Sequence, residues 1–253
     1  SLTNSLLSSA GLPVPRSTVV RSEDDAVEGA RSIGYPVVLK PLDGNHGRGV
    51  ALNLRNEKQV RAAFAHAYDE SSNGDVVVES FVAGNDYRVL VVGGKLAAVA
   101  QRVPAGVTGD GQHTVRQLVE IENGDPRRGI GHERVLTRIR ITPAAEELVR
   151  SQGSGLEEVP PAGQRVNLAA TGNMSTGGTA IDRTGEAHPD NVEIAETAAR
   201  VIGLDVAGID FIVPDISVPV NFTRMTLGFC CTRHCVASTC STSLVPMPNA
   251  RAP

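Results

Sequence analysis

Residues 35–50 read YPVVLKPLDGNHGRGV, and the rest of the chain is interpreted outward from this stretch. Residues 37–39 are a short apolar run that predicts a buried strand. Lys40 ends the run, and the glycines after it let the backbone approach a ligand and point N–H groups at phosphate oxygens. A compact positive charge beside such a loop suits a phosphate group. Taken alone, the pattern fits an ordinary hairpin loop with a surface lysine equally well.

The elements on either side of this stretch indicate the fold class. Residues 50–54 predict a second strand where a P-loop would have a helix, and no Gly-Lys-Ser/Thr occurs in the loop. Gly93-Gly94 joins two further strands as a tight hairpin. Helices and strands alternate without regular βαβ units, which favours an α+β fold with mixed and antiparallel sheets. We expect two subdomains, residues 1–78 and 79–221.

Three other places carry polar residues that suit ligand binding. Glu79 leaves a Val-rich strand and leads to Asp86 and Arg88, a set that fits either a nucleotide or a polar hinge. Residues 173–178, NMSTGG, form a loop able to bind a carboxylate or phosphate, or a plain surface loop. Asp210 lies within an apolar strand and needs a partner, which a metal ion or an ion pair would supply.

Composition excludes several classes of function. The chain has 253 residues, of which 41% are hydrophobic, and a net charge of −4, which argues against a nucleic-acid partner. No apolar run approaches the roughly 20 residues of a membrane span, and the N-terminus does not resemble a secretory signal. We therefore expect a cytoplasmic enzyme domain without a membrane partner. The absence of an initiator Met suggests that it is part of a longer protein.

The last part of the chain differs from the rest. All four cysteines lie between Cys230 and Cys240, and none of the 28 acidic residues follows Asp215. Residues 222–253 are therefore expected to form an atypical, disordered tail. A change of reading frame near codon 222 would explain this composition.

The order of these segments resembles the ATP-grasp carboxylate–amine ligases and, within them, the cyanophycin-synthesising type. The resemblance covers nearly all of residues 1–221. It is carried by residues 35–50, by VVVESFVAGNDYRVLVVGGKLAAVAQRVPA (76–105), by NGDPRRGIGHERVLT (123–137), by NMSTGG (173–178) and by GLDVAGIDFIVPD (203–215).

The resemblance implies an activity. In this family ATP phosphorylates the carboxyl end of a growing polymer, and the amine of aspartate then attacks the acyl phosphate. ATP and Mg²⁺ are the implied cofactors, aspartate and a cyanophycin primer are the implied partners, and the parent enzyme is expected to be a homo-oligomer. Lysine, arginine and Mg²⁺ would offset the repulsion between the carboxylate and the triphosphate.

The resemblance also implies site residues by position. Residues expected to bind ATP are Lys40, Gly44, Asn45, His46, Gly47, Gly49, Glu79, Phe81, Val82 and Asp86. Among these, Lys40 would hold the phosphates, Glu79 would lie in the adenine pocket and Asp86 would face the ribose. Arginines expected to face phosphates or carboxylates during catalysis are Arg88, Arg102 and Arg165. Asn173, Ser175 and Gly177 would contact substrate, and Asp210 would be the first magnesium ligand.

One departure from the family pattern affects the metal site. The family's last catalytic strand carries Glu-x-Asn, whereas no acidic residue follows Asp215 in this chain. We therefore expect the last strand to be missing, the edge of its neighbour to be unpaired, and Mg·ATP binding and turnover to be weak. The alternatives are a nucleotide-binding fragment without catalysis and another ATP-grasp peptide ligase.

Overall fold

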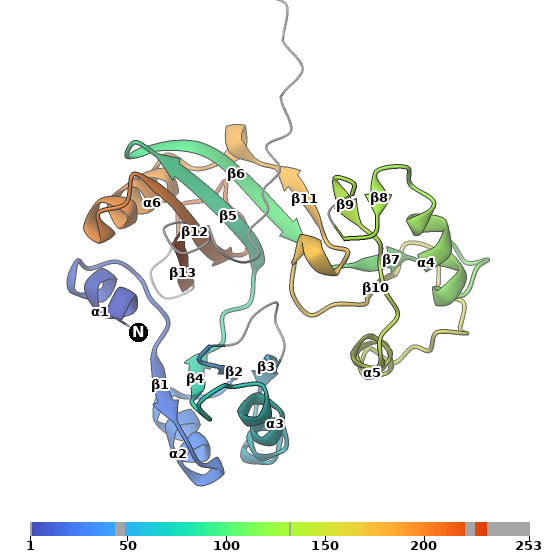
Figure 1. Ribbon diagram of the computed structural model, residues 1–253, viewed down its shortest axis with the longest axis horizontal. Helices are drawn as coiled ribbons and strands as arrows, with labels where there is room; N and C mark the ends of the chain where they lie inside the picture. Colours follow the sequence, from blue (N-terminus) through green and yellow to red (C-terminus); the bar gives the residue numbers. More distant parts are fainter. Residues whose placement is uncertain (1, 44–48, 132, 221–225, 232–253) are drawn as a thin grey trace, which may run out of the picture.

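The computed structural model describes residues 2–43, 49–131, 133–220 and 226–231. Two antiparallel sheets dominate these residues: one has the strand order β1-β4-β2-β3 and the other β11-β6-β5-β12-β13. The sheets belong to different parts of the molecule, and a third part extends from the larger sheet (Figure 1). The predicted α+β class with antiparallel sheets is confirmed.

The smaller sheet carries the stretch from which the sequence was interpreted. Two helices cover one face of it, and Val37, Leu39 and Val78 are buried in the core between them. Ser22 and Asn56 cap these helices by accepting from backbone N–H groups of the first turn, as their positions lead one to expect. The elements are β1 (Ser17–Val20), α2 (Glu23–Ile33), β2 (Val37–Pro41), β3 (Ala51–Leu54), α3 (Glu57–Asp69) and β4 (Val76–Ser80).

The larger sheet separates a buried face from an open one. Tyr87, Ile209 and Phe211 point to the buried face, where α6 and α1 pack. Leu7 of α1 is fully buried in this core, although α1 precedes the smaller sheet in the chain. The elements are α1 (Leu2–Ser9), β5 (Asn85–Val92), β6 (Lys95–Val103), β11 (Thr179–Asp182), η2 (Thr184–Glu186), α6 (Pro189–Ile202), β12 (Val206–Val213) and β13 (Thr226–Cys231).

A third part lies between β6 and β11 and has its own core, which includes Val107, Val115 and Val149. Its short strands form two small sheets, in which β7 pairs with β10 and β8 with β9. Both ends of the insertion join the larger sheet (Figure 1). The elements are β7 (Gly106–Thr108), α4 (Val115–Asn123), β8 (Arg128–Gly129), β9 (Leu136–Thr137), α5 (Pro143–Ser151), β10 (Arg165–Asn167) and η1 (Met174–Thr176).

The expectation of a missing last strand is wrong. Thr226–Cys231 forms β13 and pairs antiparallel with β12, so that Ile212 lies opposite Thr226 and Ala207 opposite Cys231. The open edge of β12 offers unpaired backbone groups, and this segment has no proline that would prevent the ladder. The predicted disorder therefore fails for residues 226–231, while residues 222–225 and 232–253 lie outside the described residues.

None of the helices in the described ranges has the length and apolar character needed to cross a membrane.

Candidate active site

Two of the predicted nucleotide-binding residues meet on the smaller sheet. Lys40 lies on β2 and Glu79 on the neighbouring β4, and Lys40 Nζ is 2.8 Å from Glu79 Oε2. Lys40 lies opposite Val77, two residues from Glu79, so both side chains emerge on the same face of the sheet. The Lys40 side chain stays 38% exposed, which leaves its ammonium group open to a ligand.

The glycine loop is anchored at both ends. Gly44, Asn45, His46 and Gly47 lie outside the described residues. At the start of the loop, Asp43 accepts from Ser71 Oγ at 2.9 Å and from the Ser72 N–H at 3.0 Å, and these bonds lower the pKa of its carboxyl group. At the end, Gly49 has φ 68° and lies so close to Glu70 and Pro41 that a Cβ would be about 3 Å from each.

Phe81 and Val82 occupy the connection between the two sheets. The Phe81 N–H donates to the Pro36 carbonyl at 3.1 Å, which fixes the start of the connection on the smaller sheet. Gly84 packs against the backbone of Val213 at the end of β12, where a Cβ would lie 2.6 Å from the carbonyl carbon. The connection thus holds the two sheets next to each other at the point where the expected adenine-pocket residues lie.

Four charged residues form a network on the open face of the larger sheet. Arg88 Nε is 2.5 Å from Asp210 Oδ1, and Arg102 Nη2 is 2.6 Å from Asp86 Oδ1. Arg102 also reaches Asp210 at 3.2 Å, so it bridges the two carboxylates. The register explains the grouping, because Asp86 lies opposite Arg102 and Arg88 opposite Asp210. Sequence analysis named all four residues, and the structure brings them together.

The network balances two guanidinium groups against two carboxylates, and one buried guanidinium N–H is left over among the described residues. Burial, the largest cause, raises the pKa of Asp86, although the hydrogen bond from Arg102 acts in the opposite direction. Arg102 Nε is buried and has no hydrogen-bond partner within the described residues. A phosphate or carboxylate could therefore compete with the two aspartates for these guanidinium groups, whose planar forks match such anions.

The partner that Asp210 requires is an arginine, Arg88. The described residues contain no group of three or more His, Cys, Asp or Glu side chains able to hold a metal ion. The β13 residue directly opposite Asp210 is Gly228, which has no side chain to act as a ligand. The donor set at this place therefore does not make up a magnesium site, and the role of Asp210 as a ligand stays a prediction.

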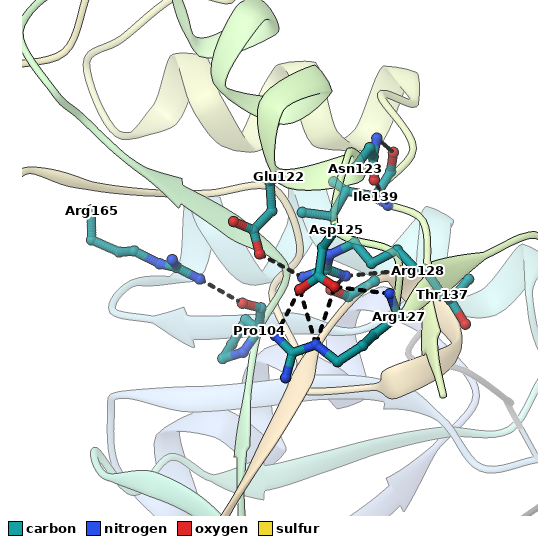
Figure 2. Close-up of polar contacts among 10 residues, drawn as sticks. Pro104, Glu122, Asn123, Asp125, Arg127, Arg128, Thr137, Ile139 and Arg165 are labelled. Carbon is teal, nitrogen blue, oxygen red and sulfur yellow. Dashed lines mark hydrogen bonds and ion pairs between the residues drawn. The ribbon is translucent and has the colours of Figure 1, made fainter. Parts of the chain in front are cut away.

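Arg165 and the 173–178 loop meet at the end of β6. Arg165 Nη2 donates to the Pro104 carbonyl at 3.0 Å (Figure 2), and burial lowers the pKa of its guanidinium group. Thr179 pairs with Val103, so the loop enters β11 beside the same strand end. Gly172, just before the loop, approaches Arg102 so closely that a Cβ would lie 2.7 Å from the Arg102 Cβ.

A cleft of about 860 Å³ lies between the end of the glycine loop and the third part of the molecule, and neither Lys40 nor Arg102 lines it. Gly49 lines it from the smaller sheet, and Ser175 lines it from the 173–178 loop. Its wall carries charges of both signs, from Arg138 and Arg140, which precede α5, and from Glu70 and Glu147. The anchored end of the glycine loop and the expected substrate loop therefore face the same space.

Sequence analysis missed Arg128 as a functional candidate. Its side chain is only 2% exposed, and its guanidinium group donates to the Thr137 carbonyl at 2.8 Å, the Gly177 carbonyl at 3.0 Å and Glu122 at 2.9 Å. Figure 2 shows it beside Arg127, whose side chain is 70% exposed and pairs with Asp125. The sequence signal was the Arg127-Arg128 pair, which does not reveal which of the two is buried.

The sequence of this chain is similar to those of known proteins over most of its length, as the identities to two of them show. A family model described as an ATP-grasp domain matches residues 1–83. The chain is 49% identical over 223 residues, 88% of its length, to a cyanophycin synthetase of Synechocystis, of which it spans 26%. It is 37% identical over 87% of its length to a glutathione biosynthesis bifunctional protein of Mannheimia succiniciproducens, of which it spans 29%.

One solved structure agrees with the fold. The crystal structure of a bifunctional glutathione synthetase from Pasteurella multocida matches with a TM-score of 0.59 and 32% identity, over 90% of this chain and 31% of that one. The chain thus spans about a quarter of the length of the cyanophycin synthetases that it matches.

Proposed function

Because this chain has the ATP-grasp fold and is related to cyanophycin synthetases, we propose that it is a carboxylate–amine ligase domain that uses ATP to join aspartate to the carboxyl end of a polymer. The observation that carries the proposal is the cleft shared by Gly49 and Ser175. In such an arrangement, a nucleotide held by the smaller sheet and a carboxylate held near β6 would enter the same space.

The proposed reaction has two steps. An oxygen of the polymer carboxylate attacks the terminal phosphorus of ATP, and ADP leaves. The amine of aspartate then attacks the acyl carbon, phosphate leaves with the bonding electron pair, and the amine loses its proton to solvent. The cleft wall would shield the acyl phosphate from water.

The chain's own residues would serve this reaction by binding and charge neutralisation. Lys40 would hold the ATP phosphates, and Glu79 would accept from the adenine amino group. Arg88 and Arg102 lie on the open sheet face and would offset the repulsion between the two anions, as Arg165 would at the end of β6. Asn173 and Ser175 would orient the carboxylate substrate.

Magnesium would neutralise phosphate charge during transfer, and Asp210 is the one proposed ligand among the described residues. Because Gly228 lies opposite it, we expect Mg·ATP binding and turnover to be weak. This observation favours a second candidate function, a nucleotide-binding domain that has lost catalysis.

The experiment combines calorimetric titration of Mg·ATP with an assay of ADP release in the presence of aspartate and a cyanophycin primer. We expect measurable nucleotide binding and low, aspartate-dependent ADP release. Binding without any release would favour the nucleotide-binding candidate, and a folded chain that binds no nucleotide would contradict both. Rapid aspartate-dependent release would refute the expected impairment.

Substituting cysteine, glutamate or glycine for aspartate in the same assay tests the substrate. A preference for one of these would indicate another ATP-grasp peptide ligase, in line with the likeness to glutathione biosynthesis proteins. Sedimentation of the parent protein would test the expected homo-oligomer.

A further inference from the structure

Arg128 is a buried cation whose hydrogen bonds all go to other segments. Its side chain is 2% exposed, and the guanidinium group contacts α4 through Glu122, β9 through the Thr137 carbonyl, and the end of η1 through the Gly177 carbonyl. Burying a charge is costly unless it is paired and hydrogen-bonded, and these three acceptors offset that cost. The side chain therefore ties the end of η1, 49 residues away, to its own neighbourhood in α4 and β9.

One polar atom of this arrangement has no partner in the part of the chain that the structure describes. Arg128 Nε is buried and lacks a partner within the described residues, so part of the desolvation cost is uncompensated. The ion-pair partner of the arginine, Glu122, is 46% exposed, so only the arginine of this pair is buried. What an arginine adds here is its rigid fork, because a single nitrogen, Nη1, donates to both carbonyls while Nη2 reaches Glu122.

The Gly177 carbonyl belongs to the loop expected to bind substrate. Gly177 has φ 94° and ends η1, whose three residues include Ser175. Within the loop, the Asn173 carbonyl accepts from Thr176 and from the Gly178 N–H, whereas the Gly177 carbonyl accepts from outside it, from Arg128. A Cβ at Gly177 would lie 2.9 Å from Ile139, and Asn123 of α4 holds Ile139 by two hydrogen bonds.

We propose that Arg128 is a positioning residue, which fixes the Gly177 carbonyl so that Asn173 and Ser175 present their side chains to the acceptor carboxylate. The identity of the substrate in this proposal rests on the proposed function. The fixing of the 173–178 loop by Arg128 does not. Arg128 does not itself line the cleft that Ser175 lines.

The first test is hydrogen–deuterium exchange on the full chain. In Arg128→Lys the compact ammonium cannot reproduce the fork, so exchange in residues 173–178 should quicken about tenfold, the effect of losing one charged hydrogen bond. Exchange in β12 should stay unchanged. The matched control is Arg127→Lys, which alters the exposed neighbour and should leave both segments as in the wild type.

A second variant covers the case in which Arg128→Lys fails to fold. The double variant Glu122→Gln/Arg128→Gln leaves no unpaired buried charge and still removes the fork. In this double variant, hydrogen–deuterium exchange should quicken in residues 173–178 and stay unchanged in β12. If the double variant is folded and its loop exchanges as slowly as in the wild type, the proposal is overturned.

The functional readout separates positioning from general stabilisation. In the ADP-release assay, the concentration of primer at half-maximal rate should rise about tenfold in Arg128→Lys, while that of ATP changes less than twofold. Equal changes for primer and ATP would overturn the proposal. A wild-type chain without turnover would count against the proposed function alone, and the exchange experiment would still decide the role of Arg128.

Discussion

At the scale of single residues, the candidate site depends on arginines that carboxylates now hold. Arg102 bridges Asp86 and Asp210, and Arg88 contacts Asp210 from the adjacent strand. In this state the two positive and two negative charges balance. If these arginines bind an anion as proposed, it would replace the carboxylates at the guanidinium groups, which the aspartates otherwise hold in place.

Removing Arg102 should therefore destabilise the fold. Arg102→Met leaves the largely buried Asp86 carboxylate without its partner, and we expect a loss of about 2 kcal/mol in the free energy of unfolding, measured in urea. Adding Asp86→Asn should recover part of the loss. Arg116→Met breaks an exposed pair with Glu157 and should cause no measurable change. Equal effects of Arg102→Met and Arg116→Met would contradict this account.

The exposed pair of Asp125 and Arg127 gives a pH prediction. The hydrogen bond from Arg127 lowers the pKa of Asp125 to about 2, below the usual value of about 3.9. A folded-state pKa below the unfolded value contributes stability that is present above about pH 4 and is lost as the pH falls toward 2. Melting curves of Asp125→Asn and wild type should therefore converge between pH 4 and pH 2. A difference that widens on acidification would refute the assignment.

At the scale of elements, the contact between the 81–84 connection and β12 sets how the sheets adjoin. Gly84→Ala would place a Cβ 2.6 Å from the Val213 backbone, which cannot move aside without bending β12. We expect a loss of about 2 kcal/mol in the free energy of unfolding, in the range of overpacked substitutions. Gly185→Ala is the control, since nothing lies within 4 Å of its Cβ position. Similar melting temperatures for both variants would count against this contact.

The register of β13 offers a way to test whether Asp210 can take part in a magnesium site. Gly228→Glu places a carboxylate directly opposite Asp210, and hard oxygen ligands are what Mg²⁺ prefers. We expect calorimetry to show Mg·ATP binding about tenfold tighter than in the wild type, in line with adding one charged contact. The matched control for side-chain size is Gly228→Gln, which carries no charge. If the glutamine variant binds as tightly, a charged ligand is not what the site lacks.

At the scale of the whole molecule, the described residues form three separate hydrophobic cores, and the segments of one core are not all consecutive in the sequence. The α1 helix precedes the smaller sheet but packs on α6, and Leu7 lies in the core of the larger sheet. The α1 helix therefore stabilises the part of the molecule that contains β12 and Asp210.

Leu7→Ala tests this packing of α1. A fully buried leucine cut to alanine should cost about 3 kcal/mol in the free energy of unfolding. Hydrogen exchange should quicken in β12 and α6 and stay unchanged in β2 and β4. Leu6→Ala, at an exposed position one residue away, is the matched control. Faster exchange in the smaller sheet would contradict the assignment of α1 to the core of the larger sheet.

By itself, the sequence determined the local features. The apolar run at residues 37–39 predicted the buried strand β2, and Gly93-Gly94 predicted the hairpin between β5 and β6. These features depend on backbone conformation and periodicity over a few residues, which short stretches of sequence specify. The resemblance to ATP-grasp ligases supplied the set of site residues, because it compared segments in their order along the chain.

Only the tertiary structure decided which distant residues meet and which are buried. Asp210 pairs with Arg88, Arg128 holds Gly177, α1 packs on α6, and β13 closes the sheet edge that was expected to stay open. Strand register and burial depend on contacts between segments far apart in the chain. Neighbouring residues such as Arg127 and Arg128 look alike in sequence, and only the packing around them makes one a surface charge and the other a buried support.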